Sequence, residues 1–335
     1  MGLLLAFSYA LHYFWHVMTF RTIVDLPKPT LALTPASRVL LLGSCFAENV
    51  GQRLAAAMPQ GHVDVNPFGV LYNPESIRHA LEILFYGSLF FPQEYIFQGR
   101  DTLFHSWMHS GTFSAPTAEE CAQAITERYD PATALLKAAD VLIVTFGTSH
   151  TYLHRQQGYV VSNCHKEAAT DFQEQCLTVE AIADAWGEML SGLEREKPGL
   201  KVVFTISPYR YAKYGMHESN LAKATLLLAV ERLCQEHRNA CYFPAYEIVT
   251  DELRDYRFYE ADMLHPSAQA SDYVYQRFAE WTFTEEMEKY AKERDAIIRA
   301  EAHRPLHPDS EEYRLFQEKL QKKKDAFQRK WKTSL

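Results

Sequence analysis

The sequence lacks a surplus of positive charge. Its 34 Lys and Arg residues are outnumbered by 42 Asp and Glu, and the formal net charge is −8. This balance argues against nucleic acid or an anionic membrane surface as the main partner. The Lys- and Arg-rich segments near the C-terminus alternate with Glu, Asp and Gln, which is typical of a solvated helix face rather than a phosphate-binding patch.

Paired cysteines are also missing. The six cysteines form no CxxC motif and follow no regular spacing, so the sequence excludes a zinc ribbon. In a chain of this length they indicate reduced, mostly buried thiols in a reducing compartment, which favours a cytoplasmic protein. The residues concerned are Cys45, Cys121, Cys164, Cys176, Cys234 and Cys241.

A clean targeting or membrane-spanning segment is absent as well. Residues 1–20 are apolar and aromatic, but they have no basic start and no clear small-residue cleavage site. His12, Tyr13 and His16 interrupt the stretch as a membrane span. We therefore expect no stable membrane insertion, and a weak export signal or anchor is the alternative for this stretch.

The most informative stretch of the chain is RVLLLGSCFAENV, residues 38–50. Its apolar run predicts a buried parallel strand, and the residues after the Gly43-Ser44 turn have helical spacing. The serine would then lie at the carboxyl end of a strand, where open α/β sheets bind ligands. Because a helix N-terminus offers N–H groups to an anion, this arrangement suits a nucleophilic serine whose attack creates an oxyanion.

The rest of the chain alternates strands and helices. With 335 residues, 47% of them hydrophobic, it can form one large domain or one domain with a smaller appendage. The alternation predicts a doubly wound parallel sheet, interrupted by an irregular insertion at 91–116 and a hairpin at 152–161. The expected strands are 38–42, 62–66, 141–146, 202–206 and 241–243; the expected helices are 76–85, 117–139, 178–197 and 220–237, with further helices beyond 269.

A serine nucleophile needs a base, and the base needs a group that holds its tautomer. Asp262-Met-Leu-His265 supplies both residue types within one turn after the fifth expected strand. Such a turn can place His265 over the same strand ends as Ser44, with Asp262 orienting its Nδ1–H. An isolated D-x-x-H motif is common by chance, so its value here comes from its position in the chain.

Several segments together resemble the GSCFA family, a group similar to SGNH hydrolases. They occur in one order over most of 18–308: GSCFAENVG (43–51), NPFGVLYNP (66–74), SNCHK (162–166), SPYR (207–210) and YRFYEADMLHPS (256–267). The resemblance implies a three-layer α/β/α flavodoxin-like domain of the SGNH type. We expect residues 1–17 to be an extension before a natural start at Met18, residues 18–280 to form this domain, and residues 281–335 to form a C-terminal helical extension.

The resemblance also implies roles for individual residues. Ser44 corresponds to the nucleophile, His265 to the base and Asp262 to the residue that orients it. The oxyanion would be bound by the backbone N–H of Ser44 and by Gly69.

The third sequence block departs from the SGNH pattern. Gly-Thr-Ser-His at 147–150 stands where Gly-x-Asn-Asp is expected, so the usual asparagine donor is absent. Either Ser149, Asn163 or His165 replaces this donor, or the oxyanion hole is weakened and the reaction differs. One such donor can contribute about 2.7–4 kcal/mol to transition-state binding.

Other residues fit binding or structural roles. Arg210, directly after the fourth expected strand, is a candidate to bind a carboxylate or phosphate of the substrate. Cys45 at the helix N-terminus and Cys164 beside His165 are more consistent with structural roles than with catalysis. The aromatic residues Phe104, Trp107 and Phe113 could stack on a substrate, but core positions are more common for such residues.

These observations favour a serine esterase or acyltransferase that acts on an O-acyl group of a small molecule or carbohydrate and needs no cofactor. The acetyl-carbohydrate element follows only from the resemblance. One alternative is a metal-dependent hydrolase built from the histidines at 105, 109, 150 and 165, although the HxxxH spacings do not lie in convincing helices. The other is a ligand-binding module that has kept the fold without efficient chemistry. The acyl group, the acceptor and the oligomeric state are left open.

Overall fold

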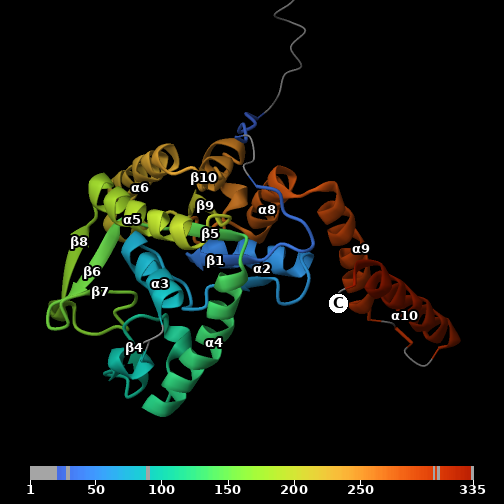
Figure 1. Ribbon diagram of the computed structural model, residues 1–335, viewed down its shortest axis with the longest axis horizontal. Helices are drawn as coiled ribbons and strands as arrows, with labels where there is room; N and C mark the ends of the chain where they lie inside the picture. The colour runs from blue at the N-terminus through green and yellow to red at the C-terminus, as the bar shows by residue number, and fades with distance from the viewer. Residues whose placement is uncertain (1–20, 28–30, 88–90, 305, 308–309, 333–335) are drawn as a thin grey trace, which may run out of the picture.

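A five-stranded parallel sheet forms the centre of the protein (Figure 1). The computed structural model describes residues 21–27, 31–87, 91–304, 306–307 and 310–332, so the expectations about residues 1–17 and Met18 lie outside the described residues. The sheet has the order β10-β9-β5-β1-β2. Its strands are β1 (Val39–Gly43), β2 (Val63–Val65), β5 (Val141–Phe146), β9 (Lys201–Ile206) and β10 (Ala240–Tyr242).

The apolar runs of the sequence form the buried strands of this sheet. All five residues of β1 and all six of β5 are buried, and the two strands pair in parallel from Val39 beside Val141 to Gly43 beside Thr145. In sequence order the five strands follow the 2-1-3-4-5 arrangement of flavodoxin-like folds. The predicted three-layer fold class is therefore confirmed.

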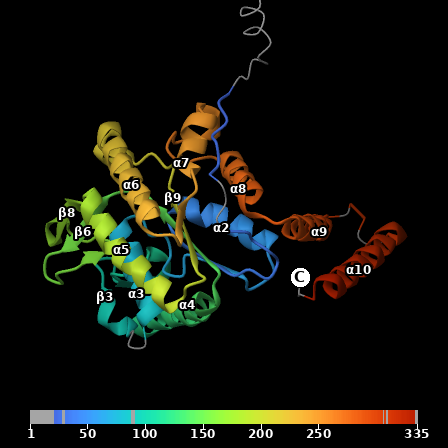
Figure 2. The same ribbon diagram turned by 45° about the horizontal axis from the view of Figure 1, so that its top comes forward.

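Helices cover both faces of the sheet (Figures 1 and 2). The residues of α3, α4, α5 and α6 share one hydrophobic cluster with β1, β5 and β9. On the opposite face α2 and α8 form a second cluster with the same sheet. The bounds are α2 Cys45–Ala57, α3 Pro74–Tyr86, α4 Ala118–Ala138, α5 Val179–Glu196, α6 Met216–Glu236, α7 Ala245–Glu247 and α8 Ala268–Thr282.

Two antiparallel units interrupt the parallel architecture. The hairpin of β3 (Ile96–Gln98) and β4 (Phe104–Ser106) lies within the predicted insertion. A three-stranded sheet follows β5, in the order β7 (Val160–Val161), β6 (His150–His154) and β8 (Phe172–Cys176). The hairpin of β6 and β7 is predicted from the sequence, whereas β8 is an additional strand.

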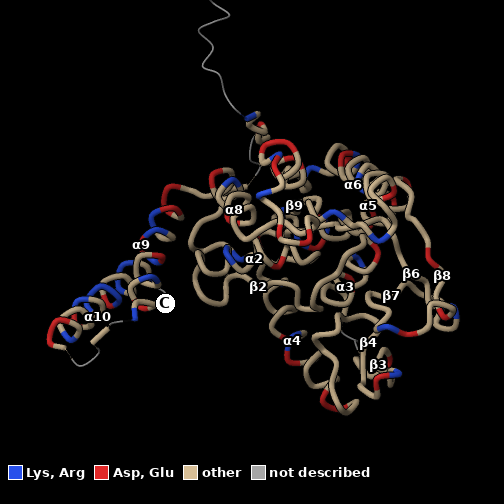
Figure 3. Tube along the Cα trace, turned by 180° about the vertical axis from the view of Figure 1, so that it is seen from behind, with Lys and Arg blue, Asp and Glu red and all other residues tan. Residues whose placement is uncertain are grey.

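The chain ends in two long helices, α9 (Glu285–Glu301) and α10 (Glu311–Trp331), which extend away from the sheet (Figures 1 and 2). Tyr290 of α9 and Phe327 of α10 are buried in the second cluster. Positive and negative residues alternate along both helices (Figure 3). Ion pairs such as Lys330–Glu293 and Lys324–Glu301 join them, which agrees with the solvated helix face expected here.

The cysteines differ from the prediction in their burial. All six are free thiols, but only Cys121 is buried and Cys176 is exposed. The expectation of mostly buried thiols is therefore wrong, because Cys176 ends β8, where four of the five residues face solvent. Within the described ranges, no helix combines the length and the apolar character needed to cross a bilayer.

Candidate active site

Turns follow four neighbouring strands at one edge of the sheet. Ser44 follows β1, Asn66 follows β2, Gly147 follows β5 and Ser207 follows β9. Because the carboxyl ends of parallel strands meet at one edge, these turns form a common surface, which is where open α/β sheets bind their ligands.

Ser44 is the N-cap residue of α2, yet its hydroxyl does not cap the helix. Only 1% of the residue is exposed, and Oγ has no hydrogen-bond partner in the described part of the chain. Six other described α-helices begin at Ser, Thr or Asn, and in each of them that side chain accepts a helix N–H. An unpaired buried hydroxyl is unfavourable. Ser44 therefore differs from the other helix-capping residues, whose side chains form the hydrogen bond that its hydroxyl lacks.

Gly43 permits the sharp turn that presents Ser44. Its φ is +149°, and a Cβ placed there would lie 2.4 Å from the carbonyl oxygen of Thr145. A side chain therefore has no room between β1 and β5 at this point. The glycine fixes the direction in which the chain leaves β1 and enters α2.

Asn66 supports the same turn from the neighbouring strand. Its Oδ1 accepts a hydrogen bond from the Gly43 N–H at 2.8 Å, and its backbone has the left-handed φ of +49° that asparagine tolerates. Its Nδ2 is buried and has no partner within the described residues. This amide donor beside the serine turn is a candidate that the sequence analysis did not identify.

Gly69, predicted as an oxyanion donor, is engaged elsewhere. Its N–H donates to the carbonyl of Asn66 at 2.7 Å. Its φ is +73°, and a Cβ would lie 1.9 Å from Ser110 Oγ, so the glycine is required by a tight turn packed against Ser110. For Gly69 to bind an oxyanion, the turn would have to give up its hydrogen bond.

Asp262 and His265 form a compact turn. Asp262 Oδ2 lies 2.5 Å from His265 Nδ1, and Oδ1 accepts the backbone N–H groups of Leu264 and His265 at 2.8 and 3.0 Å. These hydrogen bonds, led by the one from His265, lower the pKa of Asp262 to about 2. Met263 between them has φ +60°. An ionised Asp262 holds the proton of His265 on Nδ1, which leaves Nε2 as an acceptor.

Tyr209 packs against this turn. Its ring lies 4.2 Å from the His265 ring between centroids. Burial, followed by the nearby charge of Asp262, raises the pKa of Tyr209. The Arg210 N–H donates to the carbonyl of Leu264 at 3.1 Å, which places the Asp262–His265 turn beside the segment that follows β9. No hydrogen bond joins Ser44 to His265 in the described structure. Catalytic hydrogen bonds are often long before substrate binds.

Lys223 of α6 lies beneath the turns that follow β5 and β9. It is 3% exposed, and its Nζ donates to the carbonyl oxygens of Gly147 at 2.5 Å and Ser207 at 2.6 Å. Burial lowers the pKa of Lys223 to about 7, and nearby Cys45 opposes the shift. This lysine therefore holds the altered third block in place, a role that its position within a long helix does not reveal in the sequence.

The three proposed replacements for the missing asparagine have different surroundings. His165 Nε2 contacts the carbonyl of Ser106 at 2.9 Å, and its ring stacks on His105, so its side chain is already engaged. Asn163 lines a cavity, and its Oδ1 accepts the His165 N–H at 2.8 Å, which fixes the orientation of its amide. Ser149 is 3% exposed and directly precedes β6.

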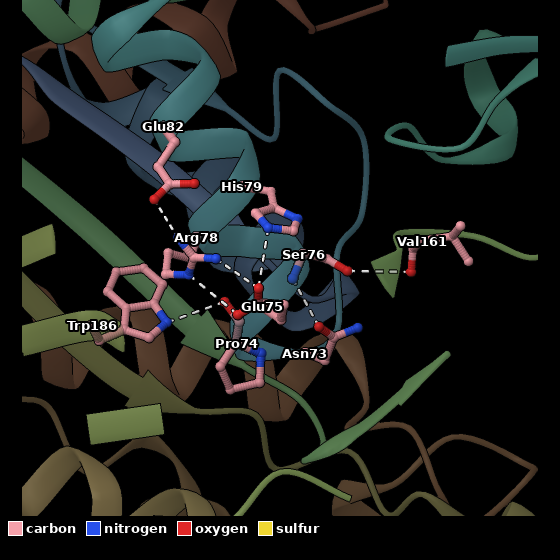
Figure 4. Close-up of polar contacts among 9 residues, drawn as sticks. All are labelled: Asn73, Pro74, Glu75, Ser76, Arg78, His79, Glu82, Val161 and Trp186. Carbon is pink, nitrogen blue, oxygen red and sulfur yellow. Dashed lines mark hydrogen bonds and ion pairs between the residues drawn. The ribbon is translucent and has the colours of Figure 1, made fainter. Parts of the chain in front are cut away.

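The loop 66–74 is fixed where α3 begins (Figure 4). Asn73 Oδ1 caps the helix by accepting the Ser76 N–H at 2.8 Å, and the Pro74 carbonyl accepts a hydrogen bond from Trp186 Nε1 at 3.1 Å. The carbonyl of Tyr72 accepts the N–H groups of Gly147 and Thr148. These bonds attach the loop to the turn after β5 and place Tyr72 beside the serine turn.

Two cavities flank this edge. The first, which we call the Arg210 cavity, has a volume of about 410 Å³ and is lined by Tyr209, Arg210 and Lys223 among others. The second, the Tyr152 cavity, has a volume of about 440 Å³ and includes Tyr72 and Tyr152. Ser44 lines neither cavity. An ester therefore reaches Ser44 only if side chains at this edge move.

The histidines of the metal alternative are occupied by other contacts. His105 contacts Ser114 and Asp101 through its two ring nitrogens, and His150 Nδ1 contacts Glu174 at 3.0 Å. Burial lowers the pKa of His109 to about 3. The described residues contain no group of three or more side chains arranged to hold a metal ion. Trp107 and Phe113 are buried, as expected for core residues.

Cys45 adjoins the serine but is not an activated thiol. The helix N–H groups of Phe46 and Cys45 lower its pKa, as expected for the start of a helix. Burial has the larger effect and raises the pKa of Cys45 above its ordinary value. A neutral thiol is a weak nucleophile, which leaves Ser44 as the nucleophile candidate at this turn.

The sheet order defines a flavodoxin-like α/β/α protein, in which Ser44 directly follows the first strand. The chain belongs to the GSCFA family: the model of that family matches residues 38–278, and the model of the GSCFA domain protein C-terminal domain matches residues 295–334. The resemblance seen in the sequence is thus confirmed.

Two solved structures are similar to this chain. A protein described as a GDSL-like lipase, from Parabacteroides merdae, is 13% identical with a TM-score of 0.36 over 76% of this chain and 99% of its own. An acetyl xylan esterase from Butyrivibrio proteoclasticus is 12% identical with a TM-score of 0.35 over 76% of this chain and 64% of its own. Both likenesses are distant, and the assignment of the fold rests on the sheet order. A search among curated proteins found no match.

Proposed function

We propose that the protein is a serine esterase or acyltransferase that acts on O-acyl esters. The observation that carries the proposal is the buried hydroxyl of Ser44, which has no partner in the described structure although it lies at a helix N-terminus. The Asp262–His265 pair at the same sheet edge supplies a base whose Nδ1 is already bonded to a carboxylate. These are the three parts that serine acyl transfer requires.

In the proposed mechanism, His265 Nε2 takes the proton from Ser44 Oγ as the oxygen attacks the acyl carbon. The oxyanion that forms is stabilised by the Ser44 N–H and by the Asn66 amide, with support from the positive end of α2. Imidazolium His265 then gives its proton to the leaving alcohol, and the C–O bond breaks to leave an acyl-enzyme. Water or an acceptor hydroxyl attacks this ester, passing its proton to His265, which returns a proton to Ser44.

Hydrolysis of 4-nitrophenyl acetate tests the proposal. We expect Ser44→Ala and His265→Ala each to abolish turnover while thermal unfolding confirms that the variants fold. Ser310→Ala is the matched control, because Ser310 is also a helix N-cap serine but belongs to α10. Activity should survive strong chelation. Added alcohol acceptors distinguish transfer from hydrolysis, because transfer yields a new ester.

A non-catalytic ligand-binding module is the second candidate. The observation that favours it is the burial of Ser44, which is 1% exposed and has no hydrogen bond to His265 within the described residues. This candidate predicts no turnover of any ester by folded wild-type protein, and a cellular effect that Ser44→Ala leaves intact.

A further inference from the structure

The Arg210 cavity concentrates positive charge. Arg210, Arg254 and Lys223 all line it, and Asp255 is its one acidic lining residue. Asp255 is already placed beside Arg257, at 3.9 Å. The whole chain carries a net charge of −8, so this local excess of positive charge is opposite in sign to the composition.

The guanidinium of Arg210 is held in position without a counterion. It lies over the rings of Tyr256 and Tyr259, 5.9 Å from each centroid, and its Nη2 contacts Met216 Sδ at 3.6 Å. Neither Arg210 nor Arg254 forms an ion pair with a carboxylate in the described part of the chain, whereas Arg53, Arg78 and Arg128 each do. A guanidinium with free donors in a cavity is suited to bind a carboxylate or a phosphate.

Lys223 contributes differently from the two arginines. Its Nζ donates to the carbonyls of Gly147 and Ser207, so its hydrogen bonds hold the turns beside the cavity together. Because burial lowers the pKa of Lys223 to about 7, this lysine is a weaker source of positive charge than the arginines. Direct contact with a bound anion is therefore assigned to the two guanidinium groups.

The cavity lies on the side of the catalytic base. The Arg210 N–H donates to the carbonyl of Leu264 at 3.1 Å, and Tyr259 pairs with Pro266 as an isolated β-bridge. Tyr209, which lines the cavity, packs against His265 with its ring tilted by 34°. In serine acyl transfer the histidine protonates the leaving alcohol, so the alcohol part of the ester lies on the histidine side.

We propose that the natural substrate carries a carboxylate or a phosphate on its alcohol part, and that Arg210 and Arg254 bind this group in the Arg210 cavity. The proposal rests on the proposed function for the orientation of the ester. The Tyr152 cavity is a poorer place for the anion, because its Lys213 is accompanied by two acids, Glu167 and Glu174.

Matched acetate esters test the preference during turnover. The pair 3-acetoxybenzoate and 3-acetoxybenzamide differs in charge at one position, and 3-acetoxyphenyl phosphate supplies the phosphate. We expect kcat/KM for the better anionic ester to exceed that of the amide at least 10-fold. This ratio should fall toward 1 in Arg210→Gln and in Arg254→Gln, and Arg210→Lys should keep part of it. Arg195→Gln, which alters an exposed arginine of α5 outside the cavity lining, should keep the full ratio.

Calorimetric titration of the product alcohols tests the anion site without chemistry. In Ser44→Ala, 3-hydroxybenzoate or 3-hydroxyphenyl phosphate should bind at least 10-fold more tightly than 3-hydroxybenzamide, and Arg254→Gln should remove the difference. The anion that binds more tightly shows whether the site prefers a carboxylate or a phosphate. Such binding without turnover in the wild type would support the anion site while refuting the proposed esterase. Turnover and binding that are equal for all three compounds would overturn the anion site while the esterase stands.

Discussion

Asp262→Asn removes the negative charge of the proposed triad while keeping most of its geometry. The asparagine oxygen can still accept the N–H groups of Leu264 and His265 that Asp262 Oδ1 accepts. Its amide nitrogen, however, replaces Oδ2 beside His265 Nδ1. The imidazole then accepts at Nδ1 and carries its proton on Nε2, where it can no longer take the proton of Ser44.

The size of the expected decrease in kcat depends on how exposed Asp262 and His265 are to solvent. In a buried triad the same change lowers kcat about 10⁴-fold. Here the side chains of Asp262 and His265 are 44% and 45% exposed, so water replaces part of the lost stabilisation of the imidazolium. We therefore expect a decrease of roughly 10²–10³-fold in kcat, with a small effect on KM.

Steady-state hydrolysis of 4-nitrophenyl acetate measures this loss. Asp262→Ala is the second variant, because it also removes the acceptor of two backbone N–H groups and should loosen the turn. Asp251→Asn is the control on a different exposed aspartate. If Asp262→Asn retained more than a third of wild-type kcat while Asp262→Ala was inactive, Asp262 would only stabilise the turn and the triad would be refuted.

Three further predictions concern the serine turn and its support. Asn66→Asp keeps an acceptor for the Gly43 N–H but replaces the free amide donor, so kcat should fall roughly 10²–10³-fold in a folded protein; kcat within threefold of wild type would exclude Asn66 as an oxyanion donor. Gly43→Ala places Cβ 2.4 Å from the Thr145 carbonyl oxygen, so it should lower the free energy of unfolding in urea by roughly 2–4 kcal/mol. The control is Gly61→Ala, because Gly61 has φ +77° but open space around it; this change should lower the free energy of unfolding by about 1–2 kcal/mol. Equal losses in the two variants would contradict the steric argument. The pKa of Lys223 is lowered from 10.5 to about 7 in the folded protein, so the unfolded chain binds more protons than the folded chain between these two pH values. The free energy of unfolding should therefore rise with pH across this window, by up to about 1.4 kcal/mol per pH unit. Lys223→Met should remove this rise.

Much of the fold follows from local patterns. Strand β5 (Val141–Phe146) matches its prediction residue for residue, and β1 and β9 match to within one residue, because continuous apolar runs ended by Gly or Ser-Pro have little alternative to a buried strand. The helix expected at 117–139 is α4, and Thr117 is its N-cap, with a side chain that accepts the Glu120 N–H.

Strand β8 could not be predicted in this way. Its sequence, FQEQC, has a single buried residue, so it shows neither an apolar run nor alternation. It forms because β6 offers an edge, and Thr151 and Tyr152 pair with Gln175 and Glu174. Such a strand depends on tertiary pairing rather than on its own sequence.

The candidate site was likewise only partly predictable. Ser44, Asp262 and His265 stand out because strand ends and a D-x-x-H turn have recognisable sequence patterns. Lys223 does not, because a lysine within a long helix is ordinarily solvated, and only the packing of α6 beneath Gly147 and Ser207 buries it. Asn66 had a weak signal, an Asn-Pro step at the end of a strand.

The central claim is that Ser44 is an activated nucleophile, and intact-mass labelling with a fluorophosphonate probe tests it most directly. The probe forms a stable bond only with a serine whose hydroxyl is deprotonated by a positioned base. We predict one adduct on the wild-type protein, mapped to Ser44 and absent from Ser44→Ala and His265→Ala, while Cys45→Ala is still labelled. A folded wild-type protein without an adduct, or with an adduct that persists in Ser44→Ala, would contradict the account.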